Sequence, residues 1–422
     1  MGHGWKNLTE QDQETILRGI RDVTPQGGPF HLEFDWTDRC NVHCFFCHND
    51  LRNATQQDLP PEIVRDCVVY AKERGLRSVR LSGGGEPLFH RRIQECLDVL
   101  VEHDVTIDNL TTNAVLLLPE SCEKMLAAGL DEVIVSLNYV DAKSYGQCME
   151  TNEKNFDRAL EGLRRLRGMD PPPGKPRPHI TVQFTLHSVT KFQIPEMYAL
   201  GRDLEADTIL IRDLYNVSDD QRIPERDKER VRQDLREAVR KDEGSGRLVV
   251  GLGHEGLNRA YEEVMEEFLA SRGAPVPQRK KNEYCYMPWY SAAIRGTGDV
   301  FACCMLMIDE TAKPLGNVRQ ESLESVWTGP GYQRIREEME RVTLCKTNMN
   351  PAKQDFEFLA PVCTQHYGCS LSCSLTAEDF FAAAERIHQA KRRSPRGILT
   401  QIKHGRPLRR NTNGPHLNGN GH

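Results

Sequence analysis

The stretch DWTDRCNVHCFFC, residues 35–47, places three cysteines, Cys40, Cys44 and Cys47, on one short segment of the chain. Three residues and then two residues separate them, so their thiolates can converge on a single loop. Such a set suits an iron–sulfur cluster. A zinc site remains open, because a neighbouring histidine could supply the fourth ligand of a tetrahedral ion. The spacing alone favours the iron–sulfur cluster.

The residues around this loop alternate short β-rich runs with helical stretches. Strands are expected at residues 31–37, 78–83, 106–113, 132–138, 179–187 and 208–215, with helices between them. Repeated strand–helix units imply a parallel sheet, because parallel strands need crossover connections. We therefore expect an α/β fold, a partial (β/α)6 TIM-like barrel. Such folds carry their chemistry at the carboxyl ends of the strands, and the cysteine loop follows the first strand directly.

Composition narrows the class of protein. The 422 residues are 27% charged and 38% hydrophobic, as in an ordinary globular protein. The sequence has no apolar run long enough to span a membrane and no apolar core near Met1 that would indicate a signal peptide. We therefore expect a cytoplasmic protein without a membrane partner.

The charge distribution argues against a nucleic-acid partner. The net charge is −6, yet residues 389–422 contain eight Lys or Arg and no Asp or Glu, so the rest of the chain is more acidic than the total. An acidic body lacks the basic surface that nucleic acids require. Residues 391–422 are expected to form a basic, disordered tail.

Fourteen cysteines are unusual for a chain without an export signal. A reducing compartment disfavours disulfides, so metal ligation or redox chemistry is the better explanation. Seven of the cysteines lie between Cys285 and Cys373, which predicts a second metal region. The expected division is an N-terminal helical extension (1–30), the barrel (31–222), a solvated helical linker (223–280), a cysteine-rich domain (281–390) and the tail (391–422).

The cysteine loop resembles the CxxxCxxC signature of the radical S-adenosylmethionine superfamily, and the GGGEP at residues 83–87 matches its GGE motif. The resemblance implies that Cys40, Cys44 and Cys47 hold a [4Fe–4S] cluster whose fourth iron binds S-adenosylmethionine. It also implies cofactor contacts from Phe46, Gly84, Gly85, Glu86, Asn113 and Ser136. Asn113 and Ser136 are also typical of turn or capping positions.

The second cysteine region resembles the SPASM or twitch extension of the same superfamily. Twelve residues separate Cys285 from Gly298, and four more precede Cys303. The resemblance implies one or two auxiliary iron–sulfur clusters, with ligands from Cys285, Cys303, Cys345, Cys363, Cys369 and Cys373. Two fully cysteine-ligated clusters would need eight ligands, and this region has seven cysteines, with Ala360 where the family pattern has a cysteine.

The resemblance further implies a 5′-deoxyadenosyl radical that abstracts hydrogen from a C–H bond, with a flavodoxin- or ferredoxin-type protein as reductant. Cys148 follows the fourth predicted strand and is a candidate to return a hydrogen atom; its alternative role is loop packing. We therefore expect an epimerase acting on a carbohydrate-like small molecule in antibiotic or other secondary metabolism.

Other functions remain open. The first alternative is dehydrogenation of a sugar or aminocyclitol carbinol, in which an auxiliary cluster accepts an electron. The second is peptide or protein modification, which the 39 residues before Cys40 disfavour because they leave little room for a domain that grips a leader peptide. The third is a zinc scaffold without catalytic activity.

Overall fold

A computed structural model describes residues 8–47, 55–214, 220–242, 245–250, 285–309, 311–345 and 386–387. Three of the predicted auxiliary ligands, Cys363, Cys369 and Cys373, lie outside the described residues. Cys345 ends helix α14 (Pro330–Cys345), where the backbone alone is described. No helix among the described residues is long and apolar enough to cross a membrane.

One sheet of ten strands organises the molecule, in the order β10-β9-β8-β1-β2-β3-β4-β5-β6-β7. The strands β1 to β7 are all parallel and follow one another in chain order. Their bounds are β1 His31–Asp35, β2 Ser78–Leu81, β3 Thr106–Thr112, β4 Glu132–Asn138, β5 His179–Leu186, β6 Thr208–Asp213 and β7 Leu248–Val250. The predicted α/β class and parallel, barrel-like sheet are therefore confirmed.

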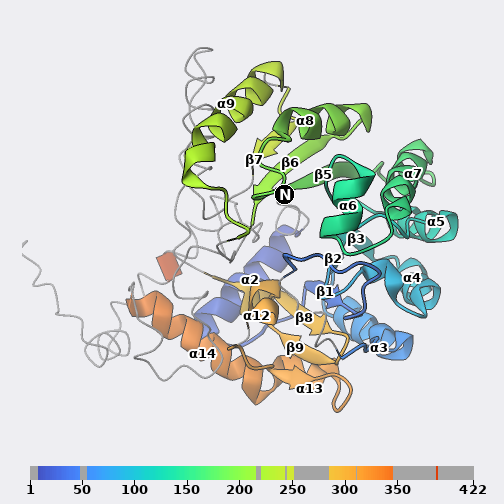
Figure 1. Ribbon diagram of the computed structural model, residues 1–422. Helices are drawn as coiled ribbons and strands as arrows, with labels where there is room; N and C mark the ends of the chain where they lie inside the picture. The colour runs from blue at the N-terminus through green and yellow to red at the C-terminus, as the bar shows by residue number, and fades with distance from the viewer. Residues whose placement is uncertain are drawn as a thin grey trace, which may run out of the picture.

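Helices cover one face of these strands, as Figure 1 shows for α3, α4, α5 and α7. The bounds of the helices between strands are α3 Pro61–Lys72, α4 Ile93–Glu102, α5 Pro119–Ala128, α7 Lys154–Gly168 and α8 Ile194–Asp203. Alternate strand residues that face these helices are apolar and fully buried, for example Leu32, Phe34, Val133 and Val135. Three cysteines, Cys67, Cys96 and Cys122, are buried in this core and act as packing residues.

The opposite face of the same strands is polar. Glu33 lies between Leu32 and Phe34 in β1, and Glu132 begins β4. Cross-strand hydrogen bonds join this set: Asn109 Nδ2 donates to Glu132 Oε2 at 3.0 Å, and Thr181 Oγ1 donates to Glu132 Oε1 at 3.1 Å. The inner wall of the open barrel is therefore a hydrogen-bonded polar surface instead of the apolar filling of a closed barrel.

The barrel extends beyond its predicted end at residue 222. Helix α9 (Glu225–Asp242) buries Val231, Leu235 and Val239, and β7 pairs with β6 in parallel. The expectation of a solvated linker is therefore wrong for residues 225–250, which add a seventh strand. The apolar residues of α9 recur at every fourth position, and such a narrow stripe suffices to dock a helix that is otherwise densely charged.

The cysteine-rich region continues the barrel sheet. Strand β8 (Ser291–Arg295) lies parallel to β1, and β9 (Asp299–Phe301) and β10 (Gly316–Asn317) follow as antiparallel neighbours. The short helices here are α11 Met287–Tyr290, α12 Cys304–Ile308 and α13 Leu323–Thr328. The domain boundary predicted at residue 281 therefore does not divide the sheet, because strands from both sides of this boundary pair with each other.

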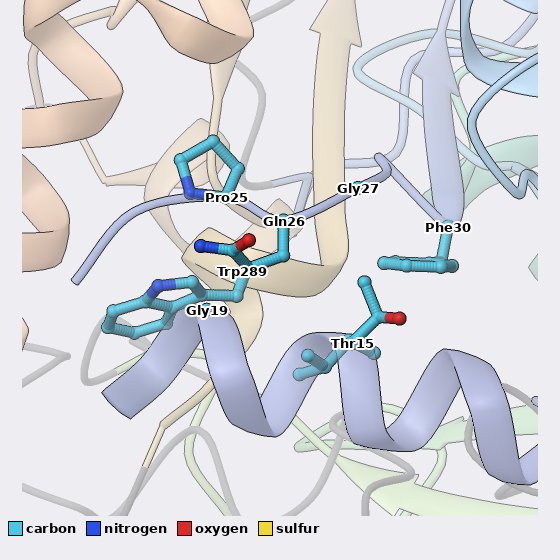
Figure 2. Close-up of a pocket in the computed structure, with 8 residues that line it drawn as sticks. Thr15, Gly19, Pro25, Gln26, Gly27, Phe30 and Trp289 are labelled. Carbon is cyan, nitrogen blue, oxygen red and sulfur yellow. The ribbon is translucent and has the colours of Figure 1, made fainter. Parts of the chain in front are cut away.

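Helix α2 (Glu10–Asp22) lies against the end of the sheet that is opposite to the predicted chemistry. Figure 2 shows the pocket there, where Trp289 and Gln26 lie over Gly19, and Phe30 faces Thr15. A Cβ atom on Gly19 would lie 3.0 Å from the Trp289 ring, so glycine permits this close packing. Phe30 and Trp289 precede β1 and β8, which places the pocket at the amino ends of the strands. We assign it to packing.

Candidate cluster and cofactor site

The cysteine loop begins where β1 ends, at the carboxyl edge of the sheet. Trp36 anchors it, because this fully buried indole donates from Nε1 to the Pro87 carbonyl at 2.9 Å. The backbone of Trp36 also accepts from Leu59 N at 2.8 Å. The loop therefore leaves the sheet in a fixed direction, tied to the segments that precede α3 and α4.

A second loop, residues 83–86, lies directly against the first. Gly85 N donates to Thr37 O at 3.1 Å, and Glu86 N donates to Arg39 O at 2.8 Å. A Cβ atom on Gly85 would stand 2.1 Å from the Arg39 carbonyl oxygen, so no other residue fits without moving one loop. The two motifs that sequence reasoning placed at neighbouring strand ends thus form one joined structure.

Asp35, the last residue of β1, stabilises this junction of the two loops. The sequence pattern alone does not identify Asp35 as a site residue. Its carboxylate accepts a short hydrogen bond from Gly84 N, and a Cβ atom on Gly84 would lie 3.0 Å from Asp35 Oδ2. Burial raises the pKa of Asp35 to about 7. The alternation of β1 indicated that Asp35 faces inward, but its partner in residues 83–85 could not be identified without the fold.

Glu86 joins the second and third strand ends. Its Oε1 accepts from Thr112 Oγ1 at 2.6 Å, and its Oε2 accepts from Asn113 N at 2.8 Å. Burial raises its pKa to about 7. Both oxygens thus hold the loops together, and the predicted contact of Glu86 with the amino group of the cofactor stays a prediction.

The three cysteines of the loop lie close enough to affect one another. Burial, then the Glu86 carboxylate, raises the pKa of Cys40 to about 12, and Cys47 adds to this shift. Burial, then Cys47 and Cys40, raises the pKa of Cys44 well above its ordinary value. Thiolates at such positions require bound cationic charge, which the irons of a cluster supply.

The arrangement suits an iron–sulfur cluster. Within the described part of the chain, no three His, Cys, Asp or Glu side chains converge closely enough to hold one metal ion. A [4Fe–4S] cluster does not need such convergence, because each thiolate binds a different iron. The donor set of three cysteines therefore fits a [4Fe–4S] cluster.

Helix α6 (Ala142–Cys148) supports the far side of the cysteine loop. His43 N donates to Met149 O at 2.8 Å, and Phe45 N donates to Cys148 O at 3.1 Å. Cys148 is half-buried and is the last residue of α6, the helix that follows β4. Burial raises its pKa, while a hydrogen bond with the Tyr139 hydroxyl lowers it.

An aromatic group continues from the loop across the ends of β4 and β5. The His187 ring lies 5.0 Å from the Phe45 ring and 6.0 Å from the Phe46 ring, measured between centroids. His187 Nε2 lies 3.2 Å from the Tyr139 hydroxyl. Burial lowers the pKa of His187 to about 4, so this buried group is neutral at physiological pH. Phe46 is half-buried and borders the predicted cofactor region.

Asn113 and Ser136 stand at the ends of β3 and β4, as expected. Asn113 Oδ1 accepts from Val115 N at 3.1 Å, a turn-capping bond, and its Nδ2 donates to Asn41 Oδ1 at 2.8 Å. Asn113 therefore caps a turn, as expected, and also forms a hydrogen bond with the cysteine loop. Ser136 is half-buried on the polar inner face, in register with Gln183. Their contacts with the cofactor remain predictions.

The predicted auxiliary ligands that are described lie around β8 and β9. Cys285 is half-buried before α11, Cys303 is buried, and Cys304 begins α12. Gly298, at φ +89°, makes the turn between the two strands; a Cβ atom there would lie 2.7 Å from Asn317 Oδ1. The expected ligand roles of Cys285 and Cys303 stay predictions, as does that of Cys345.

Two further residues near the cysteines were missed by sequence reasoning. Met149 Sδ lies 3.2 Å from Cys44 Sγ, and the buried hydroxyl of Tyr145 has no hydrogen-bond partner among the described residues. Both belong to α6 or follow it directly. Their spacing of four residues indicates a shared helix face, but the sequence does not indicate what this face meets.

Curated proteins match part of this chain in sequence. A probable GTP 3',8-cyclase of Methanosarcina acetivorans is 32% identical over 163 residues, which cover 36% of this chain and 45% of that protein. The chain therefore spans less than half the length of this curated relative. A second, from Methanocaldococcus jannaschii, is 26% identical over 42% of this chain and 56% of its own length.

Two solved structures share the fold. Streptococcus suis SuiB bound to S-adenosylmethionine aligns with a TM-score of 0.56 and 19% identity, over 84% of this chain and 81% of SuiB. The enzyme anSMEcpe with bound AdoMet and the Cp18Cys peptide aligns with a TM-score of 0.52 and 13% identity, over 89% and 99% of the two chains. At these identities the likeness establishes the fold alone.

Two family descriptions match the sequence itself. The radical SAM superfamily matches residues 35–180, and an iron–sulfur cluster-binding SPASM domain matches residues 285–348. The cofactors of these domains are a [4Fe–4S] cluster that binds S-adenosylmethionine and an auxiliary iron–sulfur cluster. The chain therefore contains a radical SAM domain, which includes the joined loops at the carboxyl edge of the sheet, and a SPASM domain, which includes the cysteine region beside β1.

Proposed function

We propose that this radical S-adenosylmethionine enzyme epimerises a carbon centre of a carbohydrate-like small molecule. When bound, the cluster and S-adenosylmethionine supply a carbon radical that takes a hydrogen atom from a C–H bond. The residues of this chain then have to hold a hydroxyl-rich substrate and to return a hydrogen atom to the opposite face of its carbon. The site offers candidates for both tasks.

The polar inner wall supports a hydroxyl- or amine-bearing substrate. Ser136 and Gln183 are half-buried on this face, and Arg212 Nη1 donates to Gln183 Oε1 at 3.3 Å. Deeper in the barrel, Glu33 and Glu132 are buried and already hydrogen-bonded. This polar wall offers hydrogen-bond donors and acceptors to a polyol. It disfavours an apolar substrate group, because the polar groups of the wall would lose their hydration without gaining new hydrogen bonds.

Cys148 is the observation that carries the proposal. Its thiol lies half-buried beside the cysteine loop, and its backbone is bonded to Phe45. Val189 N donates to His187 Nδ1 at 3.2 Å, so the neutral imidazole carries its proton on Nε2 and donates it to the Tyr139 hydroxyl. Tyr139 can then donate its own proton toward Cys148, which leaves the S–H hydrogen directed elsewhere.

The S–H bond of Cys148 breaks homolytically, its hydrogen atom forms the new C–H bond of the product, and a thiyl radical remains. One electron from a ferredoxin- or flavodoxin-type protein and one proton from solvent restore the thiol. Because the thiol exchanges with solvent, an epimerised product formed in heavy water contains one deuterium at the inverted carbon.

Turnover in heavy water tests this proposal. The reconstituted enzyme is incubated with a panel of sugars and aminocyclitols, and the products are examined by mass spectrometry. The proposal predicts a product with one deuterium, and Cys148→Ala should lose this product while still forming 5′-deoxyadenosine. Cys67→Ala, which changes a core thiol on the helix-covered face, is the matched control. A deuterium-containing product from Cys148→Ala would contradict the role of Cys148.

Dehydrogenation is the second candidate, favoured by the SPASM match, because an auxiliary cluster could accept the electron of the substrate radical. The same experiment separates it, since the product would lose two mass units and gain no deuterium. Peptide modification is a third candidate, suggested by the peptides bound in structures of SuiB and anSMEcpe. Saturable binding of a peptide together with product formation on it would replace the carbohydrate proposal.

A further inference from the structure

Tyr145 has a buried hydroxyl that no described residue partners. The residue is 0% exposed, and its hydroxyl oxygen forms no hydrogen bond with any described residue. Leaving a buried donor unsatisfied is costly, so native proteins rarely do so without a ligand or water to complete it. The hydroxyl therefore indicates a partner that the described residues do not supply.

The position of Tyr145 on α6 points to the cysteine loop. Tyr145 and Met149 are four residues apart and joined by the Met149 N to Tyr145 O bond of 2.9 Å, so their side chains share one helix face. Met149 Sδ on this face lies 3.2 Å from Cys44 Sγ. The backbone of Met149 also accepts from His43 N. This face of α6 thus rests on the loop that carries the three cysteines.

Neighbouring rings hold the phenol in place. The Tyr145 ring lies 6.4 Å from Tyr139 at an interplanar angle of 89° and 5.6 Å from Phe156. Both neighbours belong to the apolar core, so the ring cannot turn toward solvent. Burial raises the pKa of Tyr145, and Cys44, Glu86 and Cys40 raise it further, in that order. The hydroxyl is therefore near both joined loops.

We propose that the Tyr145 hydroxyl donates a hydrogen bond to a sulfur of the [4Fe–4S] cluster held by Cys40, Cys44 and Cys47. A donor directed at a cluster sulfur stabilises the reduced, more negative cluster and thus raises its reduction potential. Tyr145 is then a positioning residue that acts through the cluster. The inference depends on the cluster site alone and holds for any substrate.

Tyr145→Phe tests the inference, with Tyr139→Phe as its matched control. The two tyrosines are neighbours and both fully buried, but the Tyr139 hydroxyl already has His187 Nε2 as a partner at 3.2 Å. Both variants are reconstituted anaerobically, and the midpoint potential of the cluster is measured by titration monitored by electron paramagnetic resonance. We expect Tyr145→Phe to bind as much iron as the wild type with a more negative potential, and Tyr139→Phe to keep the wild-type potential.

Urea unfolding of the metal-free proteins gives a second readout. Without the cluster, the Tyr145 hydroxyl is a buried donor with no partner in the described part of the chain, so Tyr145→Phe should raise the urea midpoint or leave it unchanged. Tyr139→Phe should lower it, because His187 loses its acceptor. An unchanged potential in Tyr145→Phe, or a lowered urea midpoint of its metal-free form, would overturn the inference. Either failure would leave the heavy-water test of epimerisation unaffected.

Discussion

Replacement of Gly85 by alanine should separate the two loops that form the cofactor site. The added Cβ atom would stand 2.1 Å from the Arg39 carbonyl oxygen and 2.7 Å from Arg39 N. Nonbonded carbon and oxygen atoms lie at least about 3.3 Å apart, so the two loops must move apart by about 1 Å. Both contacts are with backbone atoms, and no side chain can rotate to relieve them.

The movement breaks two hydrogen bonds, from Gly85 N to Thr37 O at 3.1 Å and from Glu86 N to Arg39 O at 2.8 Å. Each bond contributes about 1 kcal/mol, and up to about 2 where its groups stay buried without partners. We therefore expect Gly85→Ala to lower the free energy of unfolding of the metal-free protein by about 2–4 kcal/mol. It should also reduce iron uptake, because the loop that carries Cys40 is displaced.

Urea unfolding of the metal-free protein measures the loss of stability. Iron content and absorbance at about 400 nm, typical of iron–sulfur clusters, are then measured after anaerobic reconstitution. Gly168→Ala is the matched control, because Gly168 ends α7 and a Cβ atom there would meet nothing within 4 Å. A Gly85→Ala protein with wild-type stability and wild-type iron content would refute the reasoning that the two loops are joined.

Three further outcomes are expected. Cys44→Ala should abolish formation of 5′-deoxyadenosine, measured by chromatography, and wild-type amounts would show that the loop is not the cluster site. Cys303→Ala should lower iron content while S-adenosylmethionine cleavage persists; equal iron would contradict its role as a ligand. Burial lowers the pKa of His31 to about 4, so the stability that depends on its neutral form is present above about pH 6.5 and is lost as the pH falls through 4. The wild type should therefore lose up to about 3 kcal/mol more than His31→Gln between pH 7 and pH 4 in urea unfolding, and parallel pH profiles would contradict this.

The strands of the barrel were predictable because their pattern has a period of two. In β1, β4 and β5, apolar residues that face the helices alternate with polar residues that face inward, and the predicted strands at 31–37, 132–138 and 179–187 overlap the observed ones closely. The cysteine loop was predictable because its ligands are close together in sequence.

The missed features depend on contacts between distant parts of the chain. Nothing near Asp35 indicates that its carboxylate meets Gly84, and nothing near Tyr145 indicates that its helix rests on the cysteine loop. The sequence of α9 predicts a solvated linker because its charges outnumber the few apolar residues that dock it. Likewise, the parallel pairing of β8 with β1 joins segments about 260 residues apart, which local patterns do not encode.

The central claim is that Cys40, Cys44 and Cys47 hold a [4Fe–4S] cluster with one iron open to S-adenosylmethionine. Electron paramagnetic resonance of the anaerobically reconstituted and reduced protein tests it most directly, with and without S-adenosylmethionine. A variant with Cys285 and Cys303 both replaced by alanine isolates this cluster from the auxiliary region. The account predicts a [4Fe–4S] signal that changes when S-adenosylmethionine is added. A colourless protein that contains zinc, or a cluster signal that S-adenosylmethionine leaves unchanged, would contradict it.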